Sequence, residues 1–101
     1  MARRKTRDKN QPEIVEAFER CGWSVIDMAD HGGGIFDLVC SIFGYTMHVE
    51  IKNPESTHGI SESQLKFMDK TFGRLELVSC VEDVERLTTV MISRVRLDAD
   101  R

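Results

Sequence analysis

The stretch that most constrains the fold of this chain lies between residues 34 and 52, where the sequence reads GIFDLVCSIFGYTMHVEIK. Residues 35–41 and 46–51 are rich in apolar and β-forming side chains, and Gly44 and Tyr45 lie between them. Two such segments joined by a short connection that contains glycine are typical of a β-hairpin. We therefore predict two antiparallel strands, with the turn at Gly44 and Tyr45.

The charged residues of this hairpin are expected to gather on one face. Successive side chains of a strand point to opposite faces, so the second strand divides into two sets, Met47, Val49 and Ile51 against His48, Glu50 and Lys52. In the first strand, we expect Asp37 on the face opposite Phe36 and Leu38. If the two strands pair, Asp37 and Glu50 approach each other beside Lys52.

Two carboxylates at one point of an apolar sheet repel each other, and the pKa of one of them rises. A divalent cation removes this conflict. Oxygen ligands favour Mg²⁺, with Mn²⁺ as an expected substitute. Mg²⁺ keeps several waters and binds phosphate oxygens, and Lys52 adds a mobile positive charge beside it. These groups are the ones needed for metal-assisted attack of water on a phosphodiester.

These residues also carry a resemblance to a known family. Asp37 followed by Glu50-Ile51-Lys52 resembles the D…(D/E)-x-K core of the PD-(D/E)XK nuclease superfamily. The segments 10–14 (NQPEI), 34–38 (GIFDL) and 61–64 (SESQ) resemble the VRR-Nuc domain in its small stand-alone phage and bacterial form. The resemblance covers roughly residues 8 to 87. Phe36 stands where the family usually has proline before the aspartate.

The resemblance implies a fold and a set of site residues. The fold is an α/β domain of the PD-(D/E)XK type, with a central mixed β-sheet flanked by helices. The implied metal ligands are Glu13, Asp37, Glu50 and the carbonyl of Ile51. Lys52 is the implied catalytic lysine and Gln64 a further site residue near it. The implied reaction leaves a 5′-phosphate and a 3′-hydroxyl.

Three of the candidate polar residues have a second interpretation. Glu13 lies three residues after Asn10, and Gln64 lies three residues after Ser61, which are the spacings of capping boxes. For Glu13 the residues alone favour capping, whereas the resemblance favours the metal site. His48 either assists catalysis or has a structural role, and a lone histidine on a strand favours the structural role.

The other elements follow from periodicity and from capping residues. In chain order we expect a helix over 10–21, a strand over 23–28, the hairpin, a helix over 61–72, a strand over 75–79 and a helix that begins at Ser79. A capping box of Ser79 and Glu82 opens the last helix. Its end stays open, because residues 88–95 are also rich in β-forming side chains.

Length and composition limit the alternatives. The chain has 101 residues, which predicts one domain over 10–101. No apolar run is long enough for a membrane span, and no apolar segment of a secretory signal follows the start. The three cysteines form no C-x-x-C pair, which favours a reducing cytoplasm. The resemblance implies that this is the cytoplasm of a bacterium or of a phage-infected host cell.

Residues 1–9 are expected to form a flexible basic arm. The overall formal charge is −3, yet this arm holds five basic residues, Arg3, Arg4, Lys5, Arg7 and Lys9. A basic arm on an acidic domain indicates a polyanionic partner such as DNA. An arm that only aids solubility explains the same residues equally well.

We therefore expect a Mg²⁺-dependent, structure-specific DNA endonuclease that resolves four-way (Holliday) junctions, as stand-alone members of the family do by resemblance. The alternatives are a nuclease directed at flaps or single strands, and a catalytically idle DNA-binding module. A two-fold homodimer suits a four-way junction. Its candidate interface is the hairpin tip, Ile42, Phe43 and Tyr45, unless these three pack under the helices of their own chain.

Overall fold

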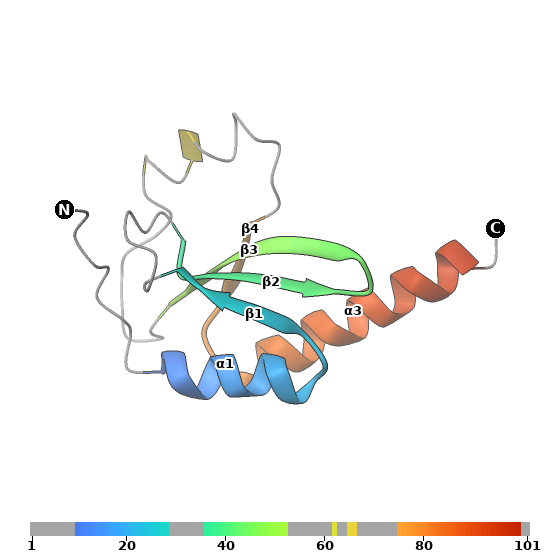
Figure 1. The fold of residues 1–101 in the computed structure, drawn as a ribbon, viewed down its shortest axis with the longest axis horizontal. Helices are drawn as coiled ribbons and strands as arrows, with labels where there is room; N and C mark the ends of the chain where they lie inside the picture. The colour runs from blue at the N-terminus through green and yellow to red at the C-terminus, as the bar shows by residue number, and fades with distance from the viewer. Residues whose placement is uncertain (1–9, 29–35, 53–61, 63–64, 67–74, 100–101) are drawn as a thin grey trace.

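The computed structural model describes residues 10–28, 36–52, 62, 65–66 and 75–99 (Figure 1). Its elements are, in chain order, α1 (Gln11–Arg20), β1 (Ser24–Asp27), β2 (Leu38–Ile42), β3 (Tyr45–Ile51), β4 (Leu75–Val78) and α3 (Val81–Ala99). The strands form one sheet in the order β1-β2-β3-β4, in which only β4 runs parallel to its neighbour. The expected α/β domain with a mixed sheet is therefore confirmed. Within the described ranges, no helix has the length and apolar character needed to cross a bilayer.

The predicted hairpin is formed by β2 and β3, but its turn lies one residue earlier than expected. The two strands pair from Leu38 with Val49 to Ile42 with Tyr45, so Phe43 and Gly44 form a two-residue turn. Their φ angles are 52° and 83°. A tight hairpin turn of this kind requires positive φ at both residues, because only then does its twist match that of the strands. The prediction placed Tyr45 in the turn, whereas it is the first residue of β3.

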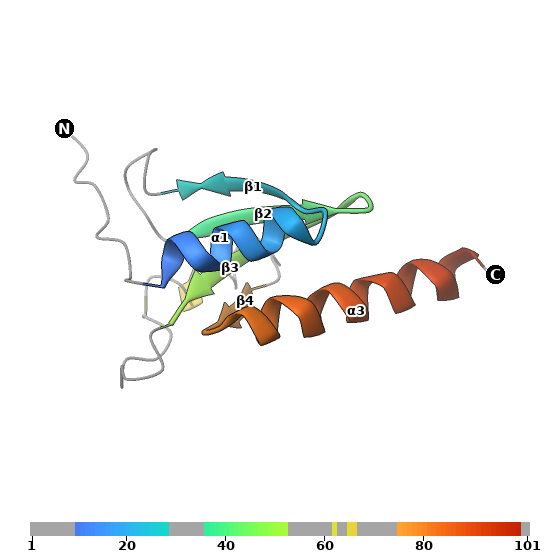
Figure 2. The same ribbon diagram turned by 90° about the horizontal axis from the view of Figure 1, so that it is seen from below.

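Both long helices cover the same face of the sheet (Figure 2). The α1 residues Ile14, Ala17 and Phe18 recur at helical spacing and are fully buried. They join Leu38, Cys40, Met47, Val49, Ile51 and Val78 from the sheet, and Val84, Leu87 and Met91 from α3, in one core cluster. Burial raises the pKa of Cys40 to about 12, so this thiol is protonated and contributes as an apolar group.

The last helix settles the choice that the sequence left open at residues 88–95. The helix α3 runs without a break to Ala99, because Val84, Leu87, Thr88 and Met91 follow a helical period toward the core. The carboxylate of Asp83 accepts a hydrogen bond from the Ser79 N–H at 2.9 Å. The residue that bonds back to the start of the helix is thus Asp83, whereas the predicted capping box used Glu82.

The hairpin tip packs on its own chain more closely than the interface hypothesis assumed. Ile42 is buried in the core cluster, and Tyr45 packs against that cluster. The Tyr45 hydroxyl donates a hydrogen bond to Asp98, and the Arg94 guanidinium lies 5.9 Å from the centre of the Tyr45 ring. Only Phe43 is strongly exposed, at 55%. Ile42 and Tyr45 therefore follow the alternative in which the tip packs on its own chain, and Phe43 is the tip residue that remains exposed.

Candidate functional site

The register of the hairpin brings the two predicted carboxylates to neighbouring positions. Asp37 is the residue directly before β2, and Glu50 is the second-last residue of β3. The β2–β3 ladder ends at the pair of Leu38 and Val49, and the Asp37 carboxylate just beyond it reaches the N–H of Ile51, the residue after Glu50. Lys52 follows directly after β3. The three residues that define the motif therefore lie at one end of the hairpin, away from its turn.

Asp37 is fixed by hydrogen bonds on both sides. Its side chain is almost fully buried, at 1% exposure, and its Oδ2 accepts a hydrogen bond from the Ile51 N–H at 2.7 Å. Its own carbonyl accepts a hydrogen bond from the Met28 N–H at 2.9 Å. Hydrogen bonds to a carboxylate are shorter and stronger than those between neutral groups. The carboxylate of Asp37 is therefore tied to the last residue of β3.

Alternation predicted Phe36 and Leu38 on the same face, but the two side chains lie on opposite faces of the sheet. Leu38 belongs to the core cluster under the helices. Phe36 instead stacks on His48, with ring centres 4.8 Å apart and planes 25° apart. His48 pairs with Val39, whose side chain lies on the face opposite that of Leu38. The reason is that residues 36 and 37 precede β2, where the strict alternation of a strand does not hold.

The surroundings of His48 favour its structural interpretation. Burial lowers the pKa of His48, so its imidazole is more readily neutral than a free histidine at the same pH. The stacking on Phe36 gives this ring a packing role on the outer face of β3. A neutral ring in an aromatic stack explains the residue without any part in proton transfer.

Glu50 is a buried acid near the end of β3, which is an inner strand of the sheet. Its exposure is 4%, and it lies on β3 between β2 and β4, with Leu77 as its register partner on β4. Moving an ionised carboxylate out of water carries a large free-energy cost unless a charge or several hydrogen bonds compensate it. Two such acids at the same end of the hairpin, Asp37 and Glu50, raise that cost further. A cation bound at this end of the sheet would lower that cost.

The backbone around Lys52 is held by Asn10, a residue that the sequence presented as a helix cap. Asn10 occupies the N-cap position of α1, but its side chain makes no capping hydrogen bond. Its Nδ2 instead donates to the Ser79 carbonyl at 2.9 Å and to the Lys52 carbonyl at 3.4 Å. The Lys52 N–H donates to the Val78 carbonyl at 2.9 Å. Asn10 thus joins the start of α1 to the ends of β3 and β4.

The first turn of α1 carries two further polar residues beside this junction. Glu13 is exposed, and the side chain of Asn10, its partner in the predicted capping box, makes no cap hydrogen bond. Gln11 is almost fully buried, and neither polar atom of its amide has a hydrogen-bond partner among the described residues. The sequence gave no reason to single out Gln11, because a glutamine at the start of a helix normally faces water.

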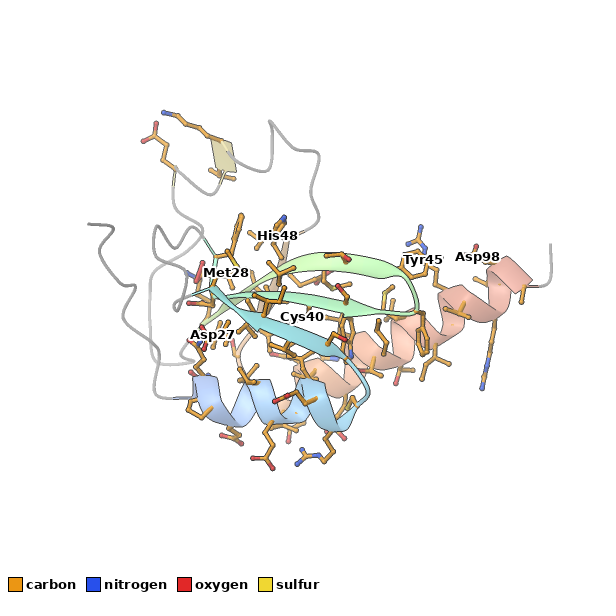
Figure 3. The ribbon with its side chains drawn as sticks, in the orientation of Figure 1. Asp27, Met28, Cys40, Tyr45, His48 and Asp98 are labelled. Atoms are coloured by element: carbon orange, nitrogen blue, oxygen red, sulfur yellow. The ribbon has the colours of Figure 1, made fainter. Side chains whose placement is uncertain are left out.

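Asp27 is a second residue that the sequence analysis passed over. It is the last residue of β1 and pairs with Leu38, so it lies one position from Asp37 in the register. Figure 3 shows Asp27 and Met28 at the end of the sheet opposite to Tyr45 and Asp98. The sequence signal that could have identified Asp27 is its position near the end of the strand predicted over residues 23–28.

Several predicted site residues lie outside the described residues. These are Gln64 and the basic residues of the arm, Arg3, Arg4, Lys5, Arg7 and Lys9. Within the described ranges, no three His, Cys, Asp or Glu side chains form a group that could hold a metal. Mg²⁺, however, commonly takes only one or two carboxylates from a protein and completes its shell with waters and phosphate oxygens. Asp37 and Glu50 fit that requirement by number and chemistry.

Comparisons with known proteins give no relative from which a function could be transferred to this chain. The chain matches no protein-family model, and searches of curated proteins and of solved structures gave no match. The functional argument accordingly starts from Asp37, Glu50 and Lys52, and from the backbone contacts that hold them.

Proposed function

We propose that this protein is a Mg²⁺-dependent endonuclease of the PD-(D/E)XK type that resembles the VRR-Nuc domain. The observation that carries the proposal is the pair of almost fully buried acids, Asp37 and Glu50, at the same end of the hairpin, with Lys52 directly after β3. Buried ionisable groups cluster at functional sites, where burial and neighbouring charges set their chemistry.

The residues divide the work of phosphodiester hydrolysis among them. Asp37 and Glu50 would hold Mg²⁺, and Glu13 and the Ile51 carbonyl would supplement them. The bound ion supplies Lewis acidity and draws the phosphate oxygens to the site. Lys52 orients the attacking water and offsets the negative charge that develops on the phosphorus oxygens in the transition state. The products carry a 5′-phosphate and a 3′-hydroxyl.

Four-way DNA junctions are the proposed substrate, and a homodimer in the cytoplasm of a bacterium or a phage-infected cell is the proposed form. A junction presents two equivalent strands, and a two-fold dimer presents two equivalent active sites. The basic residues of the arm supply contacts to the phosphate backbone, which position the protein without reading sequence.

A cleavage assay on labelled linear, flap and four-way DNA tests the substrate and the metal together. Each substrate is incubated with Mg²⁺, with Mn²⁺ and with a chelator. The proposal predicts cleavage of the four-way junction in preference to linear duplex, and none with the chelator. Preference for flaps would keep the nuclease and replace its substrate. Binding without cleavage under all conditions would leave a DNA-binding module and refute the enzyme.

A further inference from the structure

The C-terminal half of α3 carries an apolar stripe that remains exposed within the described part of the chain. Figures 1 and 2 show α3 running along the sheet and extending past the hairpin tip. The stripe lies on a flank of the helix beside its core face, and it includes Val90, which is 48% exposed, and Leu97, which is 67% exposed. Leu97 is the most exposed large apolar side chain among the described residues. Ser93 lies between the two on the same flank.

A hollow lies at the other end of the same flank, between β4 and the first half of α3. Leu77, Leu87 and Val90 form its apolar wall, with Asp83 and Arg86 at its charged rim. We call it the β4–α3 hollow. A second, shallow depression continues from Val90 past Ser93 to Leu97. Because Val90 borders both, one apolar path joins the β4–α3 hollow to the exposed Leu97.

The stripe and the hollow are complementary to each other under a two-fold rotation. Leu97 and Arg86 are about three helical turns apart, with the small Ser93 near the midpoint. If two copies of α3 pack antiparallel about that midpoint, Leu97 of each copy enters the β4–α3 hollow of the other. Isologous contacts of this kind are self-complementary and close at two subunits.

Charge along α3 favours the same antiparallel arrangement. The first half of the helix carries three acidic residues, Glu82, Asp83 and Glu85, against one basic residue, Arg86, whereas the second half carries Arg94 and Arg96 against Asp98. An antiparallel pair sets the acidic half of each copy against the basic half of the other. A parallel pair would set like charges together, which costs affinity. In the antiparallel pair, Arg96, which is next to Leu97, approaches the acidic residues near the hollow of the other copy.

We propose that this flank of α3, with the β4–α3 hollow, is the surface through which two copies of this chain associate. The inference names the interface of the dimer in the proposed function and rests on it in that respect, but it uses no nuclease chemistry. It also moves the interface away from the hairpin tip, because Ile42 and Tyr45 already pack on their own chain. Phe43 remains the matched exposed residue at that tip.

Sedimentation velocity over a range of concentrations tests the surface. The wild type is expected to dimerise, and Leu97→Glu to be monomeric while its far-UV circular dichroism is unchanged. Arg96→Glu is expected to weaken the dimer by at least ~10-fold, since it puts like charges together. Combining Arg96→Glu with Glu82→Arg and Glu85→Arg should restore most of the affinity. Phe43→Glu is the matched control and should dimerise as the wild type does.

Each other outcome overturns the proposed interface. A dimer that survives Leu97→Glu, or one that Phe43→Glu disrupts instead, places the contact elsewhere. Failure of the combined charge reversal to restore affinity refutes the antiparallel arrangement. A wild type that stays monomeric at every concentration removes the dimer altogether. If that monomer still cleaves DNA with Mg²⁺, the nuclease proposal stands while this inference falls.

Discussion

The two ends of the β2–β3 hairpin are built on opposite principles. At the open end, Asp37 and Glu50 are buried acids, and the neighbouring backbone is held by Asn10 from a distant part of the chain. At the turn, Ile42 is buried, while Tyr45 meets Asp98 in an exposed contact. Figure 3 shows the two regions at opposite ends of the sheet.

The difference indicates which end serves folding and which end serves function. A chain selected only for stability places charge in water and apolar groups inside, as the turn end largely does. The open end breaks this rule with two buried carboxylates and a buried amide, Gln11, that has no hydrogen-bond partner among the described residues. Local violations of folding rules are expected at functional sites. The comparison therefore assigns the chemistry to the open end.

The largest expected effect is a separation of activity from stability at the open end. Asp37→Asn, Glu50→Gln and Lys52→Ala are each expected to reduce cleavage by ~100-fold or more, because each removes a group that stabilises charge in the transition state. Urea unfolding without metal should show that all three variants remain folded, so that the loss of cleavage reflects the site and not the fold. Exposed Glu16→Gln is the control for both measurements. A folded Lys52→Ala protein with near-normal cleavage would refute the mechanism.

The next effect concerns the contact that holds the open end together. Asn10→Asp keeps a good N-cap residue, but it loses the donor to the Lys52 and Ser79 carbonyls and brings a carboxylate beside them. We expect a loss of ~2 kcal/mol in the free energy of unfolding. If urea unfolding shows Asn10→Asp to be as stable as the wild type, the hydrogen bonds of Asn10 to these two carbonyls do not stabilise the open end.

These two effects also show how far the sequence alone leads. Strict alternation along residues 46–51 correctly predicted that Met47, Val49 and Ile51 share one face, because all three lie in the core cluster. Asn10 could not be predicted in its actual role, because its partners lie 42 and 69 residues away along the chain. Phe36 was misplaced because alternation was extended beyond the end of the strand.

The prediction of the turn and of the last helix was limited by competing local preferences of the sequence. Gly44 was recognised as a turn residue, but φ of Phe43 is also positive, a conformation that costs a side chain about 1–2 kcal/mol and is not expected from its type. The β-forming residues 88–95 became helical because four buried side chains of α3 follow a helical period on the core. Tertiary packing overrides weak local propensity in this way.

A smaller, pH-dependent effect is expected at the start of α3. The hydrogen bond from the Ser79 N–H lowers the pKa of Asp83 below its usual value of 3.8. A carboxyl whose pKa falls on folding stabilises the protein above that usual value, and the contribution disappears as pH falls through the lowered pKa. Asp83→Asn should therefore cost ~1 kcal/mol near neutral pH, as loss of a cap does. The difference from wild type should close in strong acid, and Glu82→Gln should show no such pattern.

The smallest effect is expected at the turn end. Tyr45→Phe removes the hydroxyl that bonds to Asp98 at the surface, where water replaces the lost partner. We expect the urea midpoint and the rate of DNA cleavage to match those of the wild type. A marked fall in cleavage would contradict the separation of the two ends.

Calorimetric titration of Mn²⁺ into the folded protein tests the central claim most directly, because it asks whether Asp37 and Glu50 exist to hold a divalent cation. The account predicts saturable binding by the wild type and by Glu16→Gln. It predicts loss of that binding in Asp37→Asn and in Glu50→Gln, with circular dichroism showing that both remain folded. Equal binding by all four proteins would contradict the assignment of the open end as a metal-dependent catalytic site.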